Sequence, residues 1–195
     1  MQTTTTVVFF AILAAVLLVA ILVWAGLRRR RTDHLRERFG DEYDRTVEEQ
    51  GKRAKAEAAL AAREERVAKF DIRPLSPQER GDFSRDWREV KAVFVDSPLE
   101  SVHHADRLLA SIMKARGYPM ADFDRRYEDL TVDHGEVARH YRDGHEITER
   151  HRLGQASTED LRQAMIHFEA LFDDLVNEVA TDDEARPVRS RARTN

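Results

Sequence analysis

The most prominent pattern in the chain is an apolar run that is longer than any other. Val7 to Leu27 is 21 residues long and contains no charged side chain. A helix rises 1.5 Å per residue, so this run would span about 30 Å, the hydrocarbon thickness of a bilayer. Only helices and closed barrels satisfy their backbone groups in lipid. The pattern therefore predicts a transmembrane helix over residues 7–27, with residues 1–6 as a short external N-terminus.

The charges on either side of this run indicate its orientation. Residues 1–6 contain no Lys or Arg, whereas Arg28, Arg29, Arg30 and Arg31 follow the run directly. A cleaved signal peptide would instead have its basic residues first, a shorter apolar segment and a small-residue cleavage site. Because basic flanks stay on the cytoplasmic side, we interpret the four arginines as topology residues. They place the N-terminus outside and residues 28–195 in the cytosol.

Residues 28–70 form a second region, which is charged and has helical periodicity. Its first apolar positions recur every four residues: Leu35, Phe39, Tyr43 and Val47. After Gly51 a thinner apolar stripe follows, made of Ala56, Leu60, Val67 and Phe70, with Arg63 inside it. These heptads are too few for a sustained coiled coil. We expect a basic juxtamembrane stretch and a charged stalk of one or two helices that is able to self-associate.

Residues 71–180 contain repeated amphipathic stretches and the residues that begin and end helices. Four residues indicate helix starts: Ser76, Ser97, Asp133 and Ser157. Gly117, with Pro119 shortly after it, indicates a helix end. The pattern predicts an all-α fold with a small helical bundle over residues 71–180. Residues 181–195 are polar and aperiodic, so we expect a disordered tail there.

Composition narrows the classes of function. The chain has no cysteine, which excludes disulfides, thiolate nucleophiles and Cys-ligated metal sites. Residues 71–180 carry 15 basic and 23 acidic side chains. Such an acidic bundle is a poor partner for nucleic acid, whose binding depends on neutralising phosphates. The sequence also lacks a phosphate-binding glycine loop and a nucleophile elbow, and we expect no bound cofactor.

A histidine-rich stretch raises the question of a metal site. Its members are His134, His140, His145 and His151. A helix presents two ligands to one metal ion only at spacings of three or four residues, and no two of these histidines have that spacing. We therefore interpret them as partly exposed helix residues. His167 is expected to be a packing residue beside the bundle seam.

Histidine–carboxylate pairs keep a second hypothesis open. His145 and Glu149 are four residues apart, and Glu100 with His103 forms a single E-x-x-H motif. A di-iron bundle would need two such motifs and two further glutamates. A metal-dependent enzyme or sensor would have to collect ligands from several helices. Its candidate ligands are Glu100, His103, His134, His140, His145 and Glu149.

Several segments together carry a family resemblance: "IRPLSPQERGDFSRDWREVKAVFVDSP", "RGYP", "DHGEVARHYRDGH" and "STEDLRQAMIHFEALFDDLV". Over residues 28–178 the chain resembles an uncharacterised family of bacterial single-pass membrane proteins with a cytosolic helical domain, generally called hypothetical proteins. The resemblance implies a bacterial inner-membrane location and no particular activity. Its polar members are Arg73, Asp96, Arg116, Asp133, His134, Tyr141 and His145.

An anchor, a stalk able to self-associate and a bundle without a catalytic motif favour one function over others. We expect a membrane-anchored cytosolic interaction or scaffold module, more consistent with a binding protein than with an enzyme. Its expected partners are the lipid bilayer and either a second copy of the chain or another protein.

Overall fold

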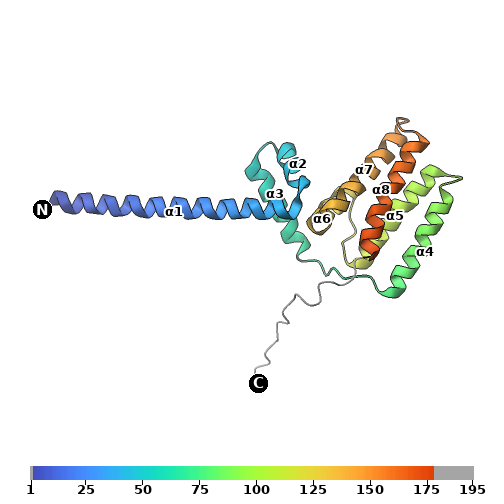
Figure 1. The fold of residues 1–195 in the computed structure, drawn as a ribbon, viewed down its shortest axis with the longest axis horizontal. Coiled ribbons are helices and arrows are strands. Elements are labelled where there is room, and N and C mark those ends of the chain that lie inside the picture. The colour runs from blue at the N-terminus through green and yellow to red at the C-terminus, as the bar shows by residue number, and fades with distance from the viewer. Residues whose placement is uncertain (1, 178–195) are drawn as a thin grey trace, which may run out of the picture. The chain divides into compact units, whose positions relative to one another are not determined.

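The computed structural model describes the backbone of residues 2–177 and the side chains of residues 16–177. Within this part of the chain the structure consists of α-helices and contains no strand. The helices are α1 (Gln2–Phe39), α2 (Asp41–Gln50), α3 (Arg53–Val67), α4 (Pro77–Val93), α5 (Pro98–Arg116), α6 (Phe123–Asp133), α7 (Gly135–Arg152) and α8 (Thr158–Asn177). Figure 1 shows their order along the chain. The predicted all-α class is confirmed.

The chain divides into two compact units, Met1–Glu64 and Glu65–Asn195. The division falls inside the last turns of α3, whereas the sequence pattern placed the end of the stalk at residue 70. The predicted tail, residues 181–195, lies outside the described residues.

The predicted transmembrane segment, Val7 to Leu27, lies within α1. The side chains of its first part, residues 7–15, lie outside the described part of the structure, as do those of the expected external N-terminus, residues 1–6. Among the described residues, no helix is long and apolar enough to cross a membrane. The membrane span therefore stays a prediction.

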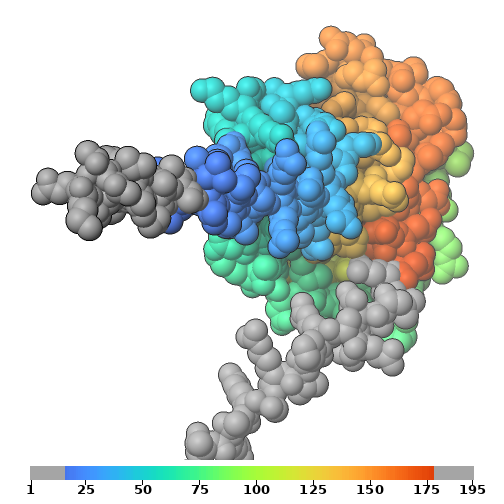
Figure 2. Space-filling model, turned by 60° about the vertical axis from the view of Figure 1, so that its left-hand side comes forward, coloured from blue at the N-terminus to red at the C-terminus, as the bar shows by residue number. Residues whose placement is uncertain are grey.

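The first unit ends in a compact three-helix arrangement where the sequence suggested a stalk. Gly40 and Gly51 both have positive φ, 51° and 66°, which suits glycine because it lacks a Cβ. They separate α1 from α2 and α2 from α3, so the stripe that began at Leu35 is shared between two helices. The core of this unit buries Leu35, Phe39, Tyr43, Ala56 and Leu60. Figure 2 shows the α2–α3 hairpin lying against α1.

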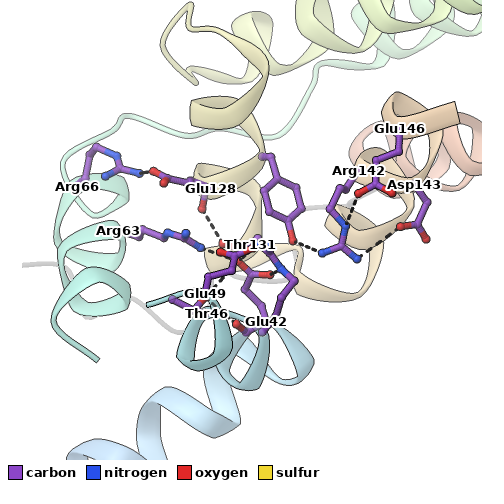
Figure 3. A network of polar contacts seen from close by, with 12 residues as sticks. Glu42, Thr46, Glu49, Arg63, Arg66, Glu128, Thr131, Arg142, Asp143 and Glu146 are labelled. Atoms are coloured by element: carbon purple, nitrogen blue, oxygen red, sulfur yellow. Dashed lines mark hydrogen bonds and ion pairs between the residues drawn. The ribbon is translucent and has the colours of Figure 1, made fainter. Parts of the chain in front are cut away.

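Arg63 also has a structural explanation in this unit. Its position interrupts the apolar stripe of α3, yet its side chain is buried. The guanidinium donates to the carboxylate of Glu42 on α2 at 2.7 Å, and Arg45 pairs with the same carboxylate (Figure 3). A charge buried in this way is tolerated because it is paired and hydrogen-bonded. Arg63 therefore joins α3 to α2 instead of pointing away from the helices.

The second unit is a bundle of five helices, α4–α8. Helix α8 packs against both α5 and α7, α4 packs on α5, and α6 packs on α7. Trp87 of α4 stacks on Phe172 of α8, with ring centroids 4.6 Å apart. Gly144 of α7 faces the buried ring of Phe168, which lies 2.6 Å from where a Cβ would be. Glycine is thus required here for the close approach of α7 and α8.

The predicted helix starts are partly correct. Ser76 forms a complete capping box with Glu79, and Ser157 accepts from the backbone of Asp160. Ser97 precedes α5 but makes no side-chain cap hydrogen bond. The prediction for Asp133 is wrong, because α6 continues through Asp133 and His134 occupies the cap position of α7.

Gly117 ends α5 as predicted and has a second role. Its φ is 102°, and a Cβ at this position would lie 2.2 Å from the carbonyl oxygen of Asp71. The backbone N–H of Arg73 donates to the carbonyl of Arg116 at 2.8 Å. The linker before α4 is therefore held against the end of α5, and only glycine leaves room for it.

Candidate functional site

The six candidate metal ligands do not come together in the bundle. Within the described residues, no group of three or more His, Cys, Asp or Glu side chains has a geometry that could hold a metal ion. His103 is exposed, Glu100 lies 3.6 Å from His104, and Glu149 pairs with Arg152. The other three candidates, His134, His140 and His145, each contact a different partner. The alternative of a multi-helix metal centre therefore gains no support from this arrangement.

His134 is buried at the junction of α6 and α7 and reaches across to α8. Its Nδ1 lies 2.5 Å from Oδ2 of Asp174. Because a carboxylate only accepts, Nδ1 carries the proton and donates it to Asp174. A charged acceptor makes such a hydrogen bond stronger than a neutral one. This contact ties the start of α7 to the last turns of α8.

His140 and His167 form a second contact between α7 and α8. Their Nδ1 atoms lie 2.9 Å apart, and their ring centroids are 5.2 Å apart. One Nδ1 must donate and the other must accept, so the accepting ring is neutral. Burial lowers the pKa of His167, and the proximity of His140 lowers it further, against the opposing charge of Asp143. The expectation that His167 is a packing residue near the seam agrees with this position, but its pairing with His140 was not foreseen.

Tyr141 is the third polar residue of α7 that reaches a neighbouring helix. It is completely buried and donates to Oδ1 of Asp106 on α5 at 2.8 Å. Arg126 of α6 approaches the same carboxylate at 3.4 Å. Burial, followed by the charge of Asp106, raises the pKa of Tyr141 above the usual range for tyrosine. The phenol therefore stays protonated and serves as a hydrogen-bond donor.

His145 makes an aromatic contact and no described ion pair. Its ring stacks on Phe123 of α6, with centroids 3.6 Å apart and planes 10° from parallel. Phe123 also lies 4.9 Å from the ring of Tyr141. His145 thus completes an aromatic cluster between α6 and α7.

The other polar residues of the resemblance lie at chain connections. Arg116 is buried, and its side chain is directed at the carbonyls of Arg73 and Leu175. Asp96 is exposed in the turn after α4. These surroundings give Arg116 an architectural role that the resemblance alone did not specify.

Figure 3 also shows ion pairs of the second unit, namely Arg66 with Glu128 and Arg142 with Asp143 and Glu146. Arg66 donates to Asp129 at 2.8 Å and to Glu128 at 3.0 Å. Burial raises the pKa of Asp129 despite the nearby guanidinium of Arg66. The second group is built on Arg142, which lies between Asp143 and Glu146 and donates to the hydroxyl of Tyr127.

Three polar side chains at the start of α7 and within it form hydrogen bonds to other helices. We call the three contacts His134–Asp174, His140–His167 and Tyr141–Asp106 the α7 seam. Each joins α7 or its cap residue His134 to another helix. None belongs to a group of three or more side chains that could hold a metal ion among the described residues. This arrangement can fix the register of the bundle.

The comparisons with known proteins bring no relative. No protein-family model, no curated protein and no solved structure matches the chain. The resemblance to the bacterial membrane-protein family therefore stays a prediction.

Proposed function

We propose that the chain is a membrane-anchored helical module that holds a protein partner, or a second copy of itself, at the cytosolic face of a bacterial inner membrane. The observation that carries this proposal is the second half of the apolar run on α1. Nine large apolar side chains there are each 56–62% exposed: Val16, Leu17, Leu18, Val19, Ile21, Leu22, Val23, Trp24 and Leu27.

These side chains occupy all sides of the helix, and no other part of the described chain covers them. A helix that is apolar all round is suited to a lipid or protein environment and not to water. The four arginines follow immediately, and the guanidinium of Arg28 lies 5.2 Å from the ring centre of Trp24. Tryptophan and arginine at the end of an apolar helix are typical of the interface between hydrocarbon and headgroups. Lipid is thus the environment that best accounts for this surface.

Support for the binding role comes from one end of the second unit. Figure 1 shows that the α4–α5 and α7–α8 connections lie at the same end of the bundle. Val95 in the first connection is 83% exposed and Leu153 after α7 is 60% exposed. These two exposed apolar side chains are available for contact with a protein partner. We propose that the protein contact lies at this end.

Cell fractionation tests the anchor. Replacing Leu18 and Leu22 with Arg puts two charges near the middle of the run, at a cost of about 2.5–3.5 kcal/mol each in membrane insertion. The native chain should stay with membranes after extraction in alkaline carbonate, whereas the double variant should be released. Met120→Arg together with Ile166→Arg is the matched control, since it adds the same two charges at exposed positions outside the run. Release of the native chain would contradict the proposal.

Crosslinking in cells tests the contact surface. The full chain should give a discrete crosslinked species, either a dimer or a complex with another protein. Val95→Glu together with Leu153→Glu should reduce its yield strongly, because a buried charge in an apolar contact is costly. Met120→Glu is the control, since Met120 is 67% exposed in the α5–α6 connection. A native chain without any discrete crosslinked species would refute the binding role.

A further inference from the structure

The turn between α2 and α3 carries a second group of basic residues. Lys52, Arg53 and Lys55 follow the left-handed Gly51, and all three side chains are exposed. In sequence they are far from the arginines that follow the apolar run. In the folded first unit, however, α2 and α3 form a hairpin that lies against α1 (Figure 2). The hydrogen bond from Thr32 to Glu57 brings the start of α3 close to these arginines.

The buried carboxylate of Glu57 holds the start of α3 next to α1. Oε1 of Glu57, on the first turns of α3, accepts from the hydroxyl of Thr32 at 2.7 Å and from Nε of Arg53 at 2.9 Å. The hydroxyl of Tyr43 donates to the same oxygen at 2.9 Å. Since Thr32 directly follows Arg31, the start of α3 is held beside the part of α1 that carries the arginines.

The carboxylate at this junction is itself stabilised in its charged form. Burial alone would raise the pKa of Glu57, but hydrogen bonds from Thr32, Tyr43 and Arg53 together lower it below the usual value. A charge-assisted hydrogen bond of this kind is strong and directional. The position of the turn beside α1 is therefore part of the folded unit and not a loose approach of two loops.

The surface around this junction is strongly basic. Arg28 to Arg31 are exposed, and four successive helix residues point in directions about 100° apart, so they encircle α1. Residues 28–33 and 48–55 together contain seven basic and three acidic side chains. One of the acidic ones, Glu49, already pairs with Arg45. The described bonds of Arg53 use its Nε, and its side chain is 56% exposed.

We propose that Arg28–Arg31 and Lys52, Arg53 and Lys55 form one basic surface that binds the anionic phospholipid headgroups around the anchor. This inference rests on the proposed membrane anchor and deepens it. Lipid is the partner because the surface begins where the apolar run ends, at the depth where headgroup phosphates would lie. Basic residues close to an anionic leaflet each gain about 1 kcal/mol, or roughly five-fold in the bound ratio. The α2–α3 turn is thus held at the membrane surface.

The absence of cysteine makes a direct test possible. Ala54→Cys places a single thiol at an exposed position of the turn. The full chain, labelled there with a fluorophore, is reconstituted into vesicles of phosphatidylcholine alone or with about a third phosphatidylglycerol. A quencher attached to lipid headgroups reports how close the turn lies to the membrane surface. We expect several-fold stronger quenching with the anionic lipid and loss of this difference at high salt.

Charge reversal provides the decisive comparison. Lys52→Glu with Lys55→Glu should lower the ratio of bound to free turn by at least about 25-fold, since two attractive charges are lost and two repulsive ones appear. Arg107→Glu with Lys114→Glu, which reverses two exposed basic residues of α5, is the matched control and should leave quenching unchanged. The helix content of each variant, measured by circular dichroism, verifies that the first unit remains folded.

The outcomes separate this inference from the anchor itself. Flotation of the vesicles in alkaline carbonate measures whether the chain is inserted, independently of the label. A chain that floats but shows quenching unaffected by lipid charge or by the reversal overturns the basic surface alone. A chain that does not float overturns both the anchor and the surface.

Discussion

Gly117→Ala is the change whose effect follows most directly from the structure. A methyl group at this position would lie 2.2 Å from the carbonyl oxygen of Asp71 and 3.4 Å from the Cα of Ile72. The obstructing atoms belong to the backbone, so a side-chain rotation cannot remove the clash. The linker before α4 would have to move away from the end of α5.

The expected cost has two parts. A left-handed conformation costs a residue with a Cβ about 1–2 kcal/mol. Displacing the linker adds about 1–3 kcal/mol for overpacking and about 1 kcal/mol for the hydrogen bond between Arg73 and Arg116. The total is about 3–6 kcal/mol. Gly154→Ala is the control because its φ is also positive, 73°, but nothing lies within 4 Å of the added methyl group; it should cost only about 1–2 kcal/mol.

Urea unfolding of the full chain in detergent measures this difference. Trp87 is buried and stacked on Phe172, so its fluorescence reports on the second unit. A Trp24→Phe background removes the only other tryptophan. The midpoint should fall much further for Gly117→Ala than for Gly154→Ala. Equal midpoints for the two variants would show that the linker is not held against α5.

The remaining predictions concern the helix seams and the buried polar groups. Gly144→Ala should destabilise the bundle by about 1–2 kcal/mol, because overpacking against the buried ring of Phe168 outweighs the gain in helix propensity. Gly81→Ala, which adds a methyl group in open space on α4, should stabilise the bundle by up to about 1 kcal/mol. Thermal unfolding midpoints of the two variants test this difference. Since the pKa of His167 is lowered in the folded state, its contribution to stability is complete above about pH 6.5 and is lost as the pH falls below this value. His167→Asn should therefore flatten the loss of stability between about pH 6.5 and 5, while the exposed His103→Asn should not, as unfolding midpoints at several pH values would reveal. Glu57→Gln should weaken the first unit by about 1–3 kcal/mol through loss of charge-assisted hydrogen bonds, and faster amide hydrogen exchange in α2 and α3 would be its signature.

Local sequence signals predicted the helices and many of their ends. Ser76 and Ser157 combine a cap residue with a carboxylate three positions later, and the structure contains both arrangements. Gly117 ends α5 as its sequence context indicates. Asp133 failed because Asp122 had already started α6, which then runs through Asp133. A cap residue predicts a helix start only where no earlier helix continues through it.

Sequence periodicity could not predict which residues of different helices contact each other. The spacing of His140 within its own helix says nothing about His167, which is brought to it by the antiparallel packing of α7 and α8. The same holds for His134 with Asp174 on α8. The stalk was expected to consist of one or two helices, with Arg63 inside its apolar stripe. In the structure Glu42 on α2 pairs with that charge within the α2–α3 hairpin. Helical periodicity identifies the buried face of a helix, but only the folded structure shows which residues pack against that face.

We propose that lipid surrounds the apolar run while the helical units lie on the cytosolic side. Single cysteines at Leu22 and Ala54, in a chain that otherwise lacks this residue, test it with a membrane-impermeant thiol reagent. In intact bacterial cells neither should react; in inside-out membrane vesicles Ala54→Cys should react at once, and Leu22→Cys only after detergent is added. Rapid labelling of Leu22→Cys without detergent, or of Ala54→Cys in intact cells, would contradict the account.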